Sequence, residues 1–335
     1  MRWTPAALKK VLPRRELALK PPKVPPIESV LEYVRADAQA ISPALRATQD
    51  ATRDAFDAGL AWLQVQGQGE AALESMAALY AGCPSSMGHL VDLWCTRFGA
   101  AYALRALCAG WAIAPRVIEG ERVSLELPWG DPGNFGTRPH TIAPFALGPT
   151  PADRRVDWGS GYAWRQLKAH LAALPDDEWE GCVAVADTLR RDAAPLTQSW
   201  LALAFCERPE WGEELAATAA SSRVGAFEVL CMVVRTPANI PWVRDGAYYR
   251  DLEPALYSML AAMGPNAAPL LIEAARRASS TPNLKSMVAA LSMIDTDASL
   301  RALLEFARSQ PKLAAVPDAL AAEYGAERIR ALSAS

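Results

Sequence analysis

The stretch SMIDTDASLRALLEFARSQPKLAAVPDALAAEYGAERIRAL, from Ser292 to Leu332, decides the fold because regular helical phasing alternates in it with clear breaks. Its first segment carries apolar residues at the i, i+3, i+4 and i+7 positions of one helical face, namely Leu300, Leu303, Leu304 and Ala307. Asp295 or Asp297 is expected to accept from the free N–H groups at the start of that helix. Pro311 then ends the helix.

The same phasing extends back through the C-terminal third of the chain, where alternate helices recur at roughly 30 residues, within the range of solenoid repeats. The expected helix starts lie near Leu252, Asn266, Leu284, Asp297, Leu313 and Ala326. A single helix pair of this kind cannot bury both of its faces, so neighbouring pairs must stack. The sequence therefore predicts an all-α fold, an α-solenoid of HEAT-like antiparallel helix pairs.

Helical periodicity also covers residues 27–114, but residues 115–161 break it. A strand is expected at Arg122–Leu127, followed by PWGDPGNFG and GPTPADRRVDWGSG, whose content of Pro, Gly, Asp and Asn no helix tolerates. We expect one irregular insertion with room for a short hairpin. The predicted parts are a basic, Pro-rich arm (1–26), N-terminal helical repeats (27–114), the insertion (115–161) and C-terminal HEAT-like repeats (162–335).

Charge is distributed unevenly along the 335 residues. Seven Lys or Arg residues against one Glu give residues 1–26 a formal charge of +6, which leaves −9 for the remainder of a chain whose total is −3. An acidic body argues against a polyphosphate-binding surface, which is normally strongly basic. If the arm binds a partner, the residues expected to do so are Arg14, Arg15, Lys20 and Lys23.

The sequence indicates a cytoplasmic protein that does not enter a membrane. The arm lacks the apolar run and small-residue cleavage site of a secretory signal. The most apolar region, Gly99–Pro115, is interrupted by Arg105 and is shorter than the roughly 18 residues that a span requires, so we expect a buried helix there. Six scattered cysteines without a CxxC pair predict reduced thiols in the core.

Motifs that carry chemistry are missing from the sequence. No GxxxxGK[ST], GxGxxG or GxSxG is present. The three histidines lie far apart: His89 is expected in the core or at a helix start, His140 in a solvated loop, and His170 on the surface of a helix. The spacing of His89 from Cys83 and Cys95 matches no zinc signature. We therefore expect no catalytic residue, no cofactor and no metal.

Nine of the eleven tryptophans fall into two groups. Six fall in or beside apolar helices and are expected to pack in the core: Trp62, Trp94, Trp111, Trp164, Trp200 and Trp211. Trp129, Trp158 and Trp242 instead lie beside Pro, Gly or Asp, where an exposed aromatic side chain can anchor a partner. Packing back over the core is the competing interpretation for these three.

Several stretches of the sequence suggest a resemblance to a known family. WRQLKAHLAALPDDEWEGCVAVADTLR, LALAFCERPEW, AALSMIDTDASLRALLEFA, AERIRALSA and VDLWCTRFGAAYALRALCAGW lie within about residues 87–335. This region resembles the HEAT-like helical repeats of large bacterial WGR-domain proteins, including the molybdate-metabolism-regulator-like group. The chain departs from them in having no WGR-like segment and in reading AEYGAERIRAL where such proteins have an Arg-Phe-Pro-type turn. The resemblance implies a repeat scaffold.

We predict a non-enzymatic scaffold that binds another protein, either as an immunity or antitoxin-like partner in a bacterium or as an adaptor. The alternative is a HEAT-like nucleic-acid-binding protein or DNA glycosylase. In that case Trp129 and Trp158 would face a base and Asp157 would lie near the lesion. The negative charge of the body makes nucleic acid the weaker choice.

Overall fold

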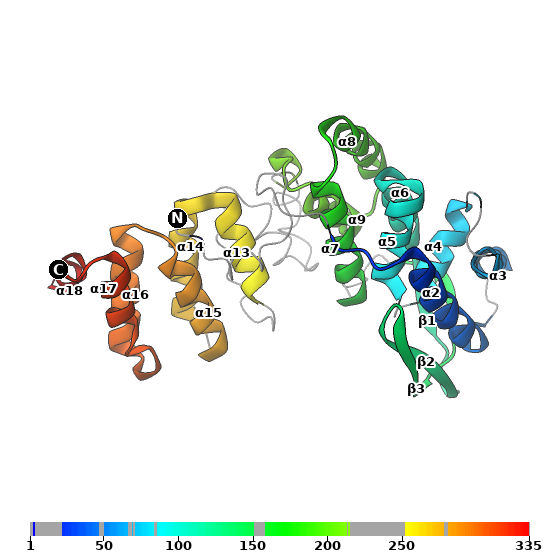
Figure 1. Ribbon diagram of the computed structural model, residues 1–335, viewed down its shortest axis with the longest axis horizontal. Helices are drawn as coiled ribbons and strands as arrows, with labels where there is room; N and C mark the ends of the chain where they lie inside the picture. The colour runs from blue at the N-terminus through cyan, green and yellow to red at the C-terminus, as the bar shows by residue number, and fades with distance from the viewer. Residues whose placement is uncertain are drawn as a thin grey trace. The chain divides into compact units, whose positions relative to one another are not determined.

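The computed structural model describes residues 3, 22–46, 50–65, 69, 71–83, 86–150, 158–212, 214, 252–277 and 281–334. Apart from residue 3, these fall into two compact units, an N-terminal unit within Pro13–Phe205 and a C-terminal unit within Cys206–Ser335. The described chain is mostly helical, as the periodicity predicts (Figure 1).

Eight α-helices are described in the N-terminal unit. They are α2 (Ile27–Ile41), α3 (Asp50–Gln64), α4 (Leu73–Gly82), α5 (Met87–Phe98), α6 (Ala100–Trp111), α7 (Trp158–Ala172), α8 (Asp176–Arg191) and α9 (Pro195–Ala204), with a 3-10 turn η2 (Ser42–Ala44). Helix α5 packs against α2, α6 and α7, and α6 packs against α4 and α8. The most apolar stretch of the sequence thus forms α6, a buried helix of 12 residues. Among the described helices, none has the length and apolarity that crossing a membrane requires.

Four strands occupy the interval expected to be irregular. They are β1 (Ile113–Val117), β2 (Val123–Asp131), β3 (Asn134–Ile142) and β4 (Phe145–Pro149). They form two antiparallel pairs, β1 with β4 and β2 with β3. The hairpin for which the prediction left room is present, and the expected strand at Arg122–Leu127 corresponds to the first half of β2, but the interval is more regular than predicted because it holds a second strand pair. Alternating Val123, Leu125 and Leu127 favour a strand. Pro132 and Gly133 form the turn of the hairpin, whereas the other Pro and Gly residues of β2 and β3 lie within the paired strands.

Helix α2 lies beside the β2–β3 hairpin (Figure 1). A two-residue turn, Pro132–Gly133, joins the strands, and Gly133 has a φ of 90°, as the third residue of a type II turn requires. Pairs of an antiparallel ladder alternate between hydrogen-bonded and non-hydrogen-bonded, starting from the pair that closes the turn, Asp131 with Asn134. Pro128 and Pro139 both fall at non-hydrogen-bonded pairs, so neither proline removes a donor from the ladder.

Tryptophans form the centre of the N-terminal core. The indoles of Trp164 and Trp200 stack with planes 3° apart and centroids 6.1 Å apart, and Trp111 lies 5.6 Å from Trp200. These side chains come from α6, α7 and α9 and are at most 3% exposed. The packing predicted for Trp94, Trp111, Trp164, Trp200 and Trp211 is confirmed. Trp62 is half-buried and donates its indole N–H to the Gly69 carbonyl at 3.2 Å.

Helices of the C-terminal unit follow one another closely. They are α13 (Leu252–Met263), α14 (Ala268–Arg277), α15 (Thr281–Ser292), α16 (Asp297–Ser309), α17 (Val316–Tyr324) and α18 (Ala326–Ala334), with 3-10 turns η5 (Gly264–Ala267) and η6 (Pro311–Leu313). Helix α15 packs against α13, α14 and α16, and α16 packs against α17 and α18. The apolar face predicted from Leu300, Leu303 and Leu304 is buried.

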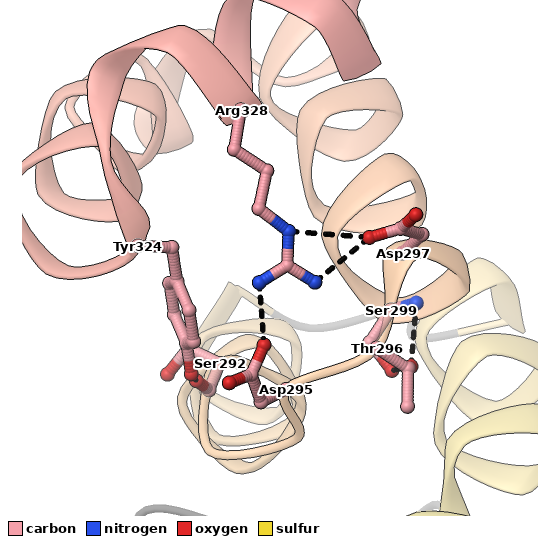
Figure 2. A network of polar contacts seen from close by, with 7 residues as sticks. All are labelled: Ser292, Asp295, Thr296, Asp297, Ser299, Tyr324 and Arg328. Carbon is pink, nitrogen blue, oxygen red and sulfur yellow. Dashed lines mark hydrogen bonds and ion pairs between the residues drawn. The ribbon is translucent and has the colours of Figure 1, made fainter.

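The start of α16 differs from the prediction. Thr296, not an aspartate, is the N-cap, and its hydroxyl accepts from the Ser299 N–H at 3.3 Å. Figure 2 shows what the aspartates contact instead: Arg328 reaches from α18 between Asp295 and Asp297. Its Nη1 and Nη2 donate to the two carboxylates at 2.7 Å each. A cation distant in sequence therefore competes with the local cap.

A second contact joins α17 to α15 in the same network. The Tyr324 hydroxyl donates to the Ser292 carbonyl at the end of α15 (Figure 2). Tyr324 is buried, whereas the carboxylates around Arg328 are about a third or more exposed. The tyrosine and the apolar residues beneath α17 and α18, chiefly Leu320 and Ile329, should therefore contribute more to the stability of this pair than the ion pairs do.

Glycine at position 59 is expected to be required for the contact between α3 and α4. A Cβ there would lie 2.6 Å from Leu79 Cγ and 2.9 Å from the Ser75 carbonyl oxygen, which is backbone and cannot rotate away. We expect Gly59→Ala to lower the free energy of unfolding by about 1–3 kcal/mol, measured by chemical denaturation.

The matched control is Gly181→Ala in α8, where a Cβ would meet nothing within 4 Å. This variant should gain about 0.5–1 kcal/mol because alanine restricts the unfolded chain and favours the helix. Equal effects of the two substitutions would contradict the close approach of α3 and α4.

Candidate functional site: the exposed face of the β2–β3 hairpin

Of the seven residues predicted to bind a partner, the structure describes the side chains of Lys23 and Trp129. Arg14, Arg15, Lys20 and Trp242 lie outside the described residues. Trp158 begins α7, but its side chain is also outside the described part. Lys23 is exposed in the segment that precedes α2. Trp129, on β2, is the one aromatic candidate whose surroundings the structure describes.

Trp129 is 55% exposed, one of three large hydrophobic side chains exposed among the described residues. Leu125 and Leu127, whose side chains lie on the same face of β2 as Trp129, are buried. This face is therefore covered by the core up to Leu127 and exposed from Trp129 onward. The guanidinium of Arg138 on β3 lies 4.1 Å from the centre of the indole ring, a cation–π contact. The register explains the contact, because Arg138 is opposite Leu127 and thus diagonal to Trp129.

Arg138 has no carboxylate partner within the described part of the chain. The consecutive residues Thr137, Arg138, Pro139, His140 and Thr141 are all exposed, and β3 contains no acidic residue from Asn134 to Ile142. We call Trp129 together with Thr137–Thr141 the hairpin surface. It combines an aromatic ring, a guanidinium and an imidazole on one exposed strand pair.

Tyr33 of α2 holds the hairpin in place. Its ring meets Phe135 of β3 and His89 of α5 edge-on, with centroids 5.0 Å apart in both cases. Its hydroxyl donates to the Pro128 carbonyl of β2 at 3.5 Å, a long hydrogen bond. Burial, followed by the charges of Asp37 and Asp131, raises the pKa of Tyr33, so the hydroxyl remains a donor at neutral pH.

A buried polar cluster lies between α2 and the start of α5. The Ser86 hydroxyl donates to Asp37 Oδ2 at 2.7 Å, and both side chains are fully buried. Burial, followed by the charge of Asp37, raises the pKa of the Cys83 thiol well above its usual value. Since the thiolate is the nucleophile and this thiol is both protonated and fully buried, Cys83 is suited to packing and not to catalysis.

His170 is not the surface residue that the sequence predicted. Its Nε2 lies 2.8 Å from Oδ1 of Asp92, a carboxylate of α5 that is 2% exposed, and the His170 side chain is 14% exposed. Gln166 Nε2 donates to the other oxygen of Asp92 at 3.4 Å. Helical phasing placed His170 correctly on α7 but could not reveal that α5 packs against that face. The pair joins two helices and is largely enclosed.

Of the other two histidines, His89 agrees with the prediction and His140 agrees only in being exposed. His89 lies in the first turn of α5, as expected, and burial lowers its pKa despite the charges of Asp92 and Asp131. His140 is exposed on β3, in a strand and not in a loop. Among the described residues no three His, Cys, Asp or Glu side chains are grouped in a way that could hold a metal ion.

Sequence reasoning missed Arg138 and Tyr33. The signal for Arg138 was the stretch NFGTRPHTI, nine residues without a carboxylate directly after a two-residue turn. Tyr33 gave no such signal, because its role depends on how α2 and the hairpin pack.

The chain belongs to the family of the YehI second domain. The model of this family matches residues 27–248, which are about two thirds of the chain. The match begins where α2 begins and includes the whole hairpin, whereas α13 to α18 lie beyond it. Neither the curated proteins nor the solved structures contain a match. The resemblance to HEAT-like repeats of WGR-domain proteins stays a prediction.

Replacement of Tyr33 should release the hairpin. We expect Tyr33→Ala to lower the free energy of unfolding by about 3–5 kcal/mol, because a buried aromatic ring is lost from the junction of three elements. Tyr33→Phe should cost less than about 1 kcal/mol, because the hydroxyl makes one long hydrogen bond. Hydrogen exchange across β2 and β3 should accelerate in the alanine variant alone. Equal exchange in both variants would show that the hydroxyl, and not the ring, positions the hairpin.

Loss of the Asp92 carboxylate should destabilise the contact between α5 and α7. In Asp92→Ala, His170 and Gln166 lose a shared acceptor in a largely buried place, for which we expect a cost of about 1–3 kcal/mol in chemical denaturation. The control is Asp187→Ala, which removes an exposed i,i+4 ion pair with Arg191 and should change stability much less. A similar loss in both variants would contradict the enclosed character of the Asp92–His170 pair.

Proposed function

We propose that this member of the YehI second-domain family is a non-enzymatic protein-binding scaffold that uses the hairpin surface to contact its partner. The observation that carries the proposal is the 55% exposure of Trp129 at the edge of a well-packed unit. An indole offers a large, rigid contact area, which is why tryptophan is enriched at the energetic centres of protein interfaces.

The surroundings of Trp129 support binding more than packing. Arg138 orients over one face of the ring without an ion-pair partner in the described part of the chain, and arginine is also enriched at interfaces. The ring is thus held in position before a partner arrives, which reduces the entropy lost on association. The hairpin itself is anchored through Tyr33, so the surface is presented on a fixed support.

The distribution of titratable groups supports a role without catalysis. Asp37, Asp92 and Cys83 are fully or almost fully buried, and the first two are hydrogen-bonded to other side chains. A catalytic group must reach a substrate, so these residues are poor candidates for general acids, bases or nucleophiles. Of the residues considered for a DNA glycosylase, Asp157 and the Trp158 side chain lie outside the described residues, and only Trp129 can be placed.

The scaffold is proposed to be a HEAT-like α-solenoid. In the C-terminal unit each helix packs against helices one or two places along the chain, with α15 against α13, α14 and α16, and α16 against α14, α15, α17 and α18. Nearest-neighbour packing of this kind is what a repeat array requires, and such arrays present extended binding surfaces. A cytoplasmic immunity or antitoxin-like protein and an adaptor are the two roles that we propose for such a scaffold. The basic arm, with Lys23, would add a second contact to the partner.

The experiment is affinity capture from the native host with the full chain, compared between wild type and Trp129→Ala and quantified by mass spectrometry. We expect at least one protein whose recovery falls about tenfold or more when the indole is removed. Folding should be unchanged by circular dichroism because the side chain is largely exposed.

The matched control is Val65→Ala, which truncates an apolar side chain of similar exposure, 60%, at the end of α3. Capture should be unaffected by this change. A capture profile that is the same for wild type and Trp129→Ala would contradict the proposed binding surface. Turnover of a substrate by the purified chain would contradict the proposed absence of catalysis.

A further inference from the structure

We propose that the hairpin surface binds an extended acidic segment of another protein, which lies along the free edge of β3. This inference rests on the proposed protein-binding function and specifies the chemistry of the partner. Three features support it: the backbone of β3, the charges along this strand, and the contacts that cover the opposite edge of the hairpin.

The two edges of the hairpin differ. The outer edge of β2 faces α2, where the Pro128 carbonyl accepts from the buried Tyr33 hydroxyl at 3.5 Å. Strand β3 has no further strand on its other side within the described sheets. By the alternation of the ladder, Thr137 and Thr141 direct their N–H and C=O groups away from β2. These groups can pair with an extended peptide, as in β-strand addition.

The charges select the chemistry of such a peptide. Arg138 and His140 are exposed on β3, no carboxylate lies between Asn134 and Ile142, and Arg138 has no ion-pair partner among the described residues. An incoming strand with Asp or Glu opposite Arg138 would form a charge-assisted hydrogen bond at an exposed site. The indole of Trp129 would pack against the methylene groups of that incoming Asp or Glu.

A second copy of this chain is a poorer occupant of the edge. Two β3 strands side by side would bring the Arg138 guanidinium groups of both copies close together, and like charges across a strand pair are destabilising. Pro139 also has no N–H to donate along that edge. Positive charge on an edge strand discourages pairing between identical chains but attracts a partner of opposite charge, whereas the missing Pro139 N–H removes one donor from either kind of pairing.

Single-stranded nucleic acid is also a poorer occupant. It would use the indole for stacking, but it needs a positively charged groove that follows several phosphates. The hairpin surface offers Arg138 and His140 alone, and Glu126 and Asp131 are exposed on the neighbouring strand. One arginine and one histidine can match a single acidic side chain but not the row of phosphates on which such binding depends.

The test is selection of a displayed library of random octapeptides on the full-length wild-type chain, repeated on Arg138→Glu. We expect wild type to enrich peptides with Asp or Glu at alternate positions and Arg138→Glu to enrich Lys or Arg instead. The best acidic peptide is made synthetically and labelled with fluorescein. Its affinity for Arg138→Glu should be about tenfold or more lower than its affinity for wild type, and this difference should shrink at high salt because ions screen the charges.

Arg122→Glu is the matched control, because this exposed arginine precedes β2 and is not part of the hairpin surface. It introduces the same change of charge and should leave the selected peptides unchanged. Hydrogen exchange at Thr137 and Thr141 should slow when the acidic peptide is bound, since their outward N–H groups become paired.

Three results would overturn the inference. The first is a selection without acidic enrichment, or with acidic peptides that bind Arg138→Glu equally well. The second is binding of the oligonucleotide dT20 that Arg138→Glu abolishes, in the absence of selected acidic peptides. The third is a dimer in sedimentation velocity that Arg138→Glu alters. If capture from the host still depends on Trp129 while the selected peptides are not acidic, the proposed function stands and only this inference fails.

Discussion

The contacts of Tyr33 are the constraint on which the hairpin surface depends. A two-stranded hairpin is marginally stable in water by itself, so β2 and β3 need a support. The Tyr33 ring supplies it by touching Phe135 on β3 and His89 on α5, while its hydroxyl reaches the Pro128 carbonyl on β2. One buried side chain of α2 therefore connects the surface that carries Trp129 to the helical core.

This arrangement leaves the hairpin with one protected edge and one open edge. The turn sets the register, the register places Pro128 and Pro139 where no ladder hydrogen bond is lost, and α2 covers the edge of β2. The edge of β3 remains, and its proline and arginine discourage self-pairing. A protein with such a surface can remain monomeric, and the outward backbone groups of β3 and the Arg138 guanidinium stay accessible to a suitable partner.

Local signals in the sequence predicted much of the helical structure and less of the site. The apolar phasing at Leu300, Leu303 and Leu304 identified α16, and the same reasoning placed Trp164 and Trp200 in the core, because both depend on one helix at a time. The N-cap of α16 and the burial of His170 were predicted incorrectly. The cap is Thr296, directly before the first helical residue Asp297, while the two aspartates bind the distant Arg328. The burial of His170 depends on Asp92, which is also far away in sequence, and periodicity contains no information on which helices meet.

Polar side chains in the described structure are either engaged in internal contacts or exposed without an ion-pair partner. The second kind identifies the candidate binding site. Asp92 is almost fully buried and tied to His170, and Arg328 is shared between two aspartates, so these groups are already engaged in internal contacts. Such groups contribute to specificity of packing and have little free energy left to offer a ligand. Arg138 is different, because its one described contact is with the face of an exposed indole. A desolvated carboxylate from a partner would gain most at this position, and for that reason the hairpin surface is the better candidate for recognition than the more elaborate networks inside the two units.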